Sequence, residues 1–243
     1  MSYVLIIGAR SDIAKAVARE YAKHGYDLYL AARKSVELEA FANDITVRTQ
    51  RTVKTVELDI LDYRSHQAFY EQLEEEPLGV ISTVGYLGDQ AKAQGDFQES
   101  KLIMDTNYTG VVSLFNIIAN DFEKRRSGFI VGISSVAGDR GRKSNYIYGS
   151  AKAALTAYLS GLRNRLYDAQ VHVLTVKPGF VATKMTEDMD LPEKLTAQPE
   201  DVAVDIFRAQ QKNMNVLYTK WIWRWVMLII RMIPEWGFKG MNI

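Results

Sequence analysis

The sequence predicts an α/β protein of one domain, in which helices cover both faces of a doubly wound parallel sheet. Short apolar runs typical of buried strands alternate with segments of helical periodicity along most of the chain. Strands that alternate with helices are joined by right-handed crossovers, which makes neighbouring strands parallel. The length of 243 residues and the 47% hydrophobic content suit a single domain with a sizeable core.

The first strand and helix set the pattern for the rest of the chain. Residues 3–7 form an apolar run, and in 12–24 the apolar residues from Ile13 to Tyr21 recur on one helical face. The same signals predict strands at 28–32, 53–58, 79–83, 129–133 and 171–176. They predict helices at 36–46, 63–74, from about 100, from 111, at 146–166 and at 199–212. We expect a Rossmann-like domain over 1–218, a tail of the same domain over 219–243, and a ligand site beyond the carboxyl ends of the strands.

Composition excludes several classes of function. Thirty basic and 29 acidic residues give a net charge of +1, so there is no global electrostatic case for a nucleic-acid partner. The chain has no cysteine and its histidines (His24, His66 and His172) lack ligand-like spacing, so we expect no disulfide, thiol nucleophile or metal site. The apolar run at 3–7 is too short for the core of a signal peptide, which predicts a cytoplasmic protein.

The turn after the first strand is a candidate dinucleotide-binding loop. Its candidate contacts are Gly8, Arg10, Ser11, Asp12 and Ile13. The turn leads into a helix, whose exposed amides and dipole can hold a pyrophosphate. A glycine-rich fingerprint would carry glycine in place of Asp12 and of the alanine at 14, so an ordinary strand–helix turn capped by Asp12 or Ser11 stays an alternative.

The end of the second predicted strand favours NADP(H) over NAD(H). A carboxylate that binds the ribose hydroxyls of NAD is expected about 20 residues after the loop. Here Ala31 and Ala32 are followed by Arg33 and Lys34. Because a guanidinium can make paired hydrogen bonds to a 2′-phosphate, we expect Arg33 to contact it, with Arg10 as second choice. A solvated basic turn is the alternative.

Tyr148 and Lys152 are candidate catalytic residues. They lie four positions apart in a predicted helix and so project from one face. A lysine cation beside a phenol stabilises the phenolate and lowers its pKa, as general acid–base chemistry at a carbonyl oxygen requires. One such pair is expected by chance in a chain with 13 tyrosines. The strand at 129–133, however, ends at Ser134 and Ser135, which places their hydroxyls at the same sheet edge as the dinucleotide loop.

Four segments, in this order, resemble the short-chain dehydrogenase/reductase family. They are Asn-Tyr-Thr-Gly at 107–110, Ile-Ser-Ser-Val-Ala-Gly at 133–138, Tyr-Gly-Ser-Ala-Lys at 148–152 and Pro-Gly-Phe-Val-Ala-Thr at 178–183. The resemblance implies that Tyr148 exchanges the proton and that Lys152 lowers its pKa and binds the nicotinamide ribose. It implies that Ser135 holds the substrate oxygen and that Asn107 supports a water relay.

The same resemblance implies further cofactor contacts. Asp59 matches the position that helps to seat the adenine, and Pro178, Gly179, Val181 and Thr183 lie in the motif beside the nicotinamide. In this family aspartate in place of Ala32 goes with NAD, and arginine in place of Arg33 goes with NADP. The chain departs from the family at 82–85, where Ser-Thr-Val-Gly stands for the usual Asn-Asn-Ala-Gly.

The tail contains an apolar segment at 221–233. Lys220, Arg224 and Arg231 form one stripe at helical spacing, and thirteen residues are fewer than the about 20 that span a bilayer. Tryptophans with a basic stripe suit a peripheral membrane contact or a lid over an apolar substrate. A helix that packs on the core or on a partner subunit is the alternative.

Within the family, the chain most resembles the reductases that complete decaprenylphosphoryl-ribose 2-epimerisation by reducing a 2-keto sugar on a polyprenyl phosphate. Residues 85–89, 107–109, 134–152 and 225–234 carry this resemblance. It implies a lipid-linked carbonyl substrate. Arg140, Arg142 and Lys143 are candidates for its phosphate, and a charged surface loop is the alternative.

Two other functions stay open. One is a 3-oxoacyl or generic ketone reductase, and the other is a non-catalytic NADP-sensing protein on the same fold. A complete set of Tyr148, Lys152, Ser135 and Asn107 argues against a pure sensor. We expect a small-molecule or lipid-linked carbonyl substrate, no nucleic-acid partner, and assembly as a homodimer or homotetramer.

Overall fold

The computed structural model describes residues 2–241 and contains a seven-stranded sheet in the order β3-β2-β1-β4-β5-β6-β9. Its strands, all paired in parallel, are β1 (Tyr3–Ile7), β2 (Asp27–Ala32), β3 (Val53–Glu57), β4 (Pro77–Ser82), β5 (Phe129–Ile133), β6 (His172–Pro178) and β9 (Val216–Thr219). The predicted doubly wound parallel sheet is confirmed. The strand order reverses between β1 and β4, so a ligand crevice is expected at their carboxyl ends.

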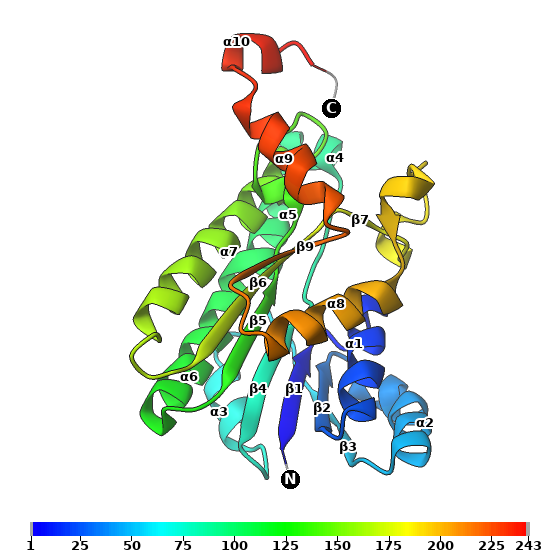
Figure 1. The fold of residues 1–243 in the computed structure, drawn as a ribbon, viewed down its shortest axis with the longest axis vertical. Helices are drawn as coiled ribbons and strands as arrows, with labels where there is room; N and C mark the ends of the chain where they lie inside the picture. Colours follow the sequence, from blue (N-terminus) through cyan, green and yellow to red (C-terminus); the bar gives the residue numbers. More distant parts are fainter. Residues whose placement is uncertain (1, 242–243) are drawn as a thin grey trace.

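Helices cover both faces of the sheet (Figure 1). Each face has its own core cluster. The first face carries α1 (Asp12–Lys23), α2 (Glu39–Thr49) and α8 (Pro199–Gln211). The opposite face carries α3 (His66–Glu71), α6 (Gly110–Arg125) and α7 (Tyr146–Arg165). Two short helices, α4 (Gln90–Gly95) and α5 (Phe97–Met104), precede α6, and α9 (Ile222–Met232) and α10 (Glu235–Phe238) form the tail.

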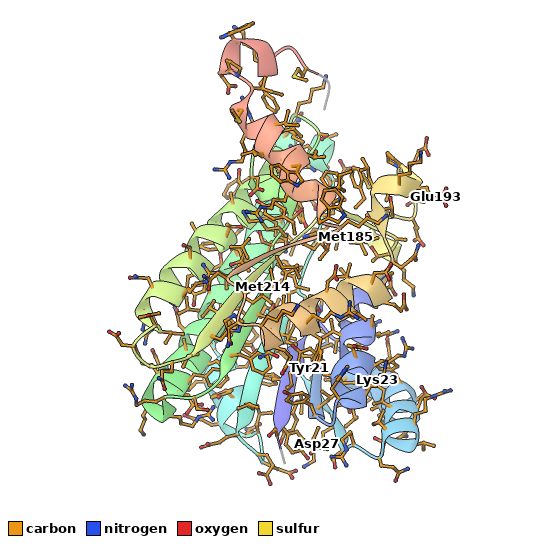
Figure 2. The ribbon with its side chains drawn as sticks, viewed as in Figure 1. Tyr21, Lys23, Asp27, Met185, Glu193 and Met214 are labelled. Carbon is orange, nitrogen blue, oxygen red and sulfur yellow. The ribbon has the colours of Figure 1, made fainter. Side chains whose placement is uncertain are left out.

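Local sequence explains these layers. Every residue of β1 and β2 is buried, because a strand covered on both faces needs an almost continuous apolar run. Helix α1 is instead amphipathic, with Tyr21 fully buried and Lys23 exposed two residues later (Figure 2). Helical periodicity therefore predicted α1 to within one residue.

Some elements differ from the prediction. The helix expected at 36–46 is a 3₁₀ turn, Ser35–Leu38, followed by α2, and α3 is shorter than the expected 63–74. The sequence did not predict α4, β9 or the two-stranded sheet of β7 (Phe180–Val181) and β8 (Thr196–Ala197). Strand β9 has only four residues and lies at the sheet edge, half exposed, so it lacks the apolar run of an interior strand.

Among residues 2–241, one helical segment, Phe97–Arg125, is long and apolar enough to cross a membrane by length and composition. Its apolar side chains Leu114, Phe115 and Ile118 are fully buried in the core cluster beside the sheet. The segment is therefore a core helix of the sheet's second face.

The inner face of the tail packs beside Gly179, which follows β6, and against β7 and β9. Trp223 and Met227 are buried, and the Trp223 indole donates a hydrogen bond to the Leu195 carbonyl at 3.0 Å. Arg140 holds the other end of α9, since its Nη1 donates to the carbonyls of Ile230 and Ile233 at 2.6 Å each. This inner face therefore agrees with the alternative interpretation of the tail, in which its helix packs on the core.

A methyl group at Gly179 is expected to displace the tail. A Cβ there would lie 2.0 Å from two atoms of the Trp223 ring, far inside van der Waals contact. Gly179→Ala should lower the free energy of unfolding by about 1–3 kcal/mol, as overpacking does. It should also expose Trp223, the buried member of the four tryptophans, to a fluorescence quencher. Gly161→Ala, where a Cβ would meet nothing within 4 Å, is the control; equal quenching and stability in both variants would contradict this packing.

Candidate active site

The turn between β1 and α1 forms a tight cradle. Gly8 has φ of +79°, and a Cβ there would lie 3.0 Å from both Thr83 Oγ1 and Val84 N. Ser11 caps α1, because its hydroxyl accepts the Ala14 N–H at 3.1 Å. Of the two candidate caps, Ser11 thus fills this role and not Asp12.

Asp12 has a different contact. Its carboxylate accepts the backbone N–H of Lys184 at 2.9 Å, which ties the start of α1 to the segment after β7. Asp12 borders neither the dinucleotide cavity nor the cavity around Tyr148. Its contact across 172 residues of sequence explains why a carboxylate stands where the fingerprint has glycine.

Thr83 joins the ends of β1 and β4. Its hydroxyl lies 2.9 Å from the Ile7 carbonyl and 3.1 Å from the Gly8 carbonyl, and it accepts a hydrogen bond from the Ser11 hydroxyl at 3.1 Å. The departure from the family at 82–85 thus supplies a hydroxyl that holds the cradle together.

A cavity of about 490 Å³ opens beside this cradle. The predicted cofactor contacts that line it are Gly8, Arg10, Ser11, Arg33 and Asp59, and Ala32 lines it next to Arg33. Arg10 forms an ion pair with Glu37 at 2.6 Å, whereas the exposed Arg33 forms no ion pair within residues 2–241. Asp59 accepts the Leu61 N–H at 3.0 Å, which fixes its carboxylate at the cavity wall.

A second cavity, of about 150 Å³, contains the predicted catalytic group. Among its lining residues are Ile13, Ser135, Tyr148, Lys152, Pro178, Gly179, Val181 and Thr183. It shares Thr83, Val84 and Gly85 with the first cavity, so the two adjoin at the carboxyl end of β4. Ser134 also borders it, but its hydroxyl is bonded into α7, 2.8 Å from the Lys152 carbonyl.

Lys152 and Tyr148 lie together and are strongly affected by burial. Lys152 is 2% exposed, and its Nζ donates to the Ile133 carbonyl at 3.0 Å and lies 5.7 Å from the centre of the Tyr148 ring. Burial lowers the pKa of Lys152 to about 7. Burial raises the pKa of Tyr148 to about 12, and the Ser135 hydroxyl acts in the opposite direction. The sequence predicted a phenol pKa lowered by lysine, whereas burial raises this pKa, and the group that opposes the rise is Ser135 and not Lys152.

Asn107 lies behind the catalytic group and lines neither cavity. It is fully buried in a π-helical turn, Asp105–Thr109, a distortion often found at functional sites. Its Nδ2 donates to the carbonyls of Tyr86 at 2.6 Å and Ile103 at 2.8 Å, and its Oδ1 accepts the Tyr86 N–H at 3.2 Å. Asn107 therefore fixes the chain segment that follows Gly85.

Gly85 is a central residue to which the sequence analysis assigned no role, although it ends the segment 82–85. A Cβ there would lie 3.5 Å from Met185 Cε, 3.7 Å from Asn107 Oδ1 and 3.8 Å from Lys152 Nζ. The distant segments that carry the site thus meet at one point. Figure 2 labels Met185 on the segment between β7 and α8.

The outer wall of the second cavity is apolar. It is formed by side chains from four separate segments, namely Leu87, Val136, Phe180, Met185 and Met189. Leu87, Val136 and Phe180 lie in segments that carry the family resemblance, but the sequence analysis assigned them no role, and Met185 and Met189 lie in no motif. An apolar wall has no fixed motif, because it depends on which loops the fold brings together. Such a wall beside a hydroxyl, a phenol and an ammonium can bind an apolar carbonyl compound.

Comparison with known proteins agrees with this arrangement. The model of the short chain dehydrogenase family matches residues 2–194. An uncharacterised oxidoreductase of Mycobacterium tuberculosis is 36% identical over 241 residues, covering 98% of this chain and 96% of the relative. An NADP-dependent 3-hydroxy acid dehydrogenase of Schizosaccharomyces pombe is 28% identical, with 88% of each chain covered. A solved short-chain dehydrogenase from Sphingobium yanoikuyae in complex with NADPH has a TM-score of 0.85 at 23% identity, with 97% of each chain covered.

Proposed function

The chain belongs to the short-chain dehydrogenase/reductase family, and from this premise we propose that it interconverts a ketone and a secondary alcohol, with Tyr148 as acid–base. It is an oxidoreductase that uses NADP(H). When bound, this cofactor supplies the hydride to the carbonyl carbon or accepts it from the alcohol. Tyr148 gives its phenol proton to the carbonyl oxygen in reduction, and the Ser135 hydroxyl holds that oxygen. The convergence of Ser135, Tyr148 and Lys152 on one cavity beside the dinucleotide cavity carries this proposal.

The residues present fit an NADP(H) molecule. The cradle at Gly8 and the start of α1 suit a pyrophosphate, and Asp59 lines the same cavity. At the end of β2 the cavity is lined by Ala32 and Arg33, so neither position carries a carboxylate. We propose that Arg33 binds the 2′-phosphate and that Arg10, already paired with Glu37, contributes less.

Arg33→Ala is expected to weaken NADPH binding by at least about tenfold and NADH binding by less than about twofold. The paired hydrogen bonds of the guanidinium need a 2′-phosphate, which NADPH carries and NADH lacks. Dissociation constants for both cofactors, measured by fluorescence titration, test this expectation. Lys34→Ala, which changes the adjacent cation, is the control, and equal losses for NADPH and NADH in Arg33→Ala would exclude the phosphate role.

The two directions of the reaction should differ in pH dependence. Alcohol oxidation needs the phenolate of Tyr148, and burial raises the pKa of this phenol to about 12. Below that pKa the phenolate fraction grows by up to about tenfold per pH unit. At saturating NADP+, the oxidation rate should therefore rise with pH through the neutral range, whereas ketone reduction, which uses the neutral phenol, should not. An oxidation rate that is independent of pH would contradict Tyr148 as the base.

We propose further that the substrate is amphipathic and is delivered at a membrane surface, as for a lipid-linked keto sugar. The outer face of α9 exposes Trp225, Ile229 and Met232 beside the basic residues Arg224 and Arg231. Tryptophans with neighbouring cations are typical of a helix that lies in an anionic membrane interface. The inner face of the same helix contacts Gly179 at the catalytic cavity, so membrane and cavity would be close together.

The tail stays part of the catalytic domain in this proposal. Its inner residues pack against β7 and β9, which supports the proposal that the domain over 1–218 continues into 219–243. A cytoplasmic location at the inner face of the membrane, and assembly as a homodimer or homotetramer, stay predictions.

The experiment for the function is NADPH oxidation over a panel of ketones. The panel contains small ketones, 3-oxoacyl thioesters and polyprenyl-phosphate keto sugars. Turnover of amphipathic ketones well above that of small ones supports the proposal, whereas preference for 3-oxoacyl thioesters or small ketones supports the generic reductase. Tight NADPH binding without turnover of any panel member would support the sensor.

The experiment for the membrane contact is sedimentation with phosphatidylglycerol vesicles. Trp225→Ser with Ile229→Ser should lose binding, whereas Phe97→Ser with Tyr167→Ser, at two more exposed apolar positions, should keep it. Vesicle binding that is unchanged in the α9 variants excludes the membrane role of this face. If the wild-type protein does not bind vesicles and has the mass of two or four subunits, and the α9 variants have the mass of one, the face is a subunit interface instead.

A further inference from the structure

Arg142 is a cation at the substrate cavity that has no acidic partner within residues 2–241. It lies in the loop between the 3₁₀ turn Val136–Gly138 and α7, and it lines the same cavity as Ser135 and Tyr148. Its guanidinium contacts Met227 Sδ at 3.5 Å, and its Nε is buried without a hydrogen-bond partner in this part of the chain. Burial lowers the pKa of Arg142, but an arginine stays charged in a protein. The Arg142 side chain is half-buried; among the residues described, its Nε has no acceptor and its Nη2 has only a thioether sulfur, and such a cation favours an anionic ligand.

The nearby charges are already paired with other groups. Asp139, the carboxylate that acts on Arg142, accepts hydrogen bonds from Lys177 at 2.5 Å and from Tyr218 at 2.7 Å. Arg140 holds the carboxyl end of α9 and pairs with Glu235 at 2.9 Å. The sequence analysis named Arg140, Arg142 and Lys143 as candidates for a phosphate. Of these three cations, Arg142 is the one that lines the cavity.

Two more polar atoms lie unpaired at the same end of α7. Asn145 Oδ1 and Gln90 Nε2 are buried without a partner among the described residues, and the other end of the Gln90 amide accepts the Ile147 N–H at 3.1 Å. Asn145 therefore offers an acceptor in the cavity that Arg142 lines, and Gln90 offers a donor at the first turn of α7, outside the cavity lining. This combination suits an anionic group with a neighbouring hydroxyl.

We propose that Arg142 binds an oxyanion, a phosphate or a carboxylate, that is part of the carbonyl substrate. The inference rests on the proposed reductase function and narrows its substrate class. The ketone would lie at Ser135 and Tyr148, the anion at Arg142, and the apolar part along Phe180 and Met185. Arg142 is then a specificity-determining residue for an anionic, amphipathic ketone.

Ligand binding tests this proposal without requiring turnover. Octyl phosphate, octanoate and octanol are titrated into the full-length protein saturated with NADP+, so that the 2′-phosphate site is filled, and binding is followed by calorimetry. We expect an anion to bind at least tenfold more tightly than octanol, and the Arg142→Met variant to lose this difference. The preferred anion distinguishes a phosphate from a carboxylate. Lys143→Met, which removes an exposed cation from the same loop, is the matched control, and Arg142→Lys should restore part of the affinity.

Kinetics separate the failure of this proposal from failure of the proposed function. For ketones that turn over, Arg142→Met should raise KM for the anionic member of a matched pair at least tenfold and leave the neutral member within twofold. Equal anion affinity in wild type and Arg142→Met, or equal effects on both ketones, overturns the role of Arg142 while the reductase function stands. Anion binding that depends on Arg142 in a protein that reduces no ketone overturns the reductase function and keeps the anion site.

Discussion

Tyr148→Phe is expected to lower NADPH-dependent ketone turnover by at least about 100-fold, as the loss of a general acid does. The phenol lies in the catalytic cavity with Ser135, and its pKa of about 12 keeps it protonated at neutral pH. It is therefore ready to give a proton to a carbonyl oxygen. The substitution removes one oxygen atom and no part of the dinucleotide cavity, so the dissociation constant for NADPH should stay within about twofold.

Tyr146→Phe is the matched control for this result. Tyr146 lies two positions before Tyr148, at the start of α7, and is 42% exposed. Steady-state kinetics and NADPH titration on both variants separate a chemical role from a general effect on α7. Equal turnover in wild type and Tyr148→Phe would remove the acid–base assignment, whatever happens to the control.

The sheet was predictable because its interior strands are continuous apolar runs. β1 and β5 have the predicted bounds, since both lie in the middle of the sheet and are covered on both faces. β9 was not predicted because an edge strand needs fewer apolar residues. α4 was not predicted because a six-residue helix has almost no periodicity. Length and burial thus determine which elements a single sequence reveals.

The candidate site was predictable only in part. Ser135 follows from the order of strands and helices, because residues after parallel strands meet at one sheet edge. Tyr148 and Lys152 lie inside α7 and were identified by their four-residue spacing and by the resemblance to the family. The contact between Asp12 and Lys184 was not predictable, since it joins residues 172 positions apart through a side chain with no motif of its own. The pKa of Tyr148 was also not predictable from the sequence, because it depends on how completely the folded protein shields the phenol from water.

Asn107→Asp is expected to lower the free energy of unfolding by about 3 kcal/mol and ketone turnover by at least about tenfold. In the wild type the Asn107 Nδ2 donates to two carbonyls, those of Tyr86 and Ile103. A carboxylate at this buried position has no proton to donate, so it would face both carbonyl oxygens with its own charge. The segment that contains Gly85 and Tyr86 would then shift away from Lys152, and urea unfolding with steady-state kinetics measures both effects.

The pH dependence of this variant identifies the cause. Burial beside two carbonyls raises the folded-state pKa of the introduced carboxyl above its unfolded value, so its destabilising effect appears above the unfolded pKa and grows with pH. The loss of stability should therefore be smaller at about pH 5 than at about pH 8, because a protonated carboxyl can donate one hydrogen bond. Asn43→Asp, at an exposed site on α2, should show neither effect. A loss of stability in Asn107→Asp that is the same at both pH values would mean that the two carbonyls do not depend on a donor from residue 107.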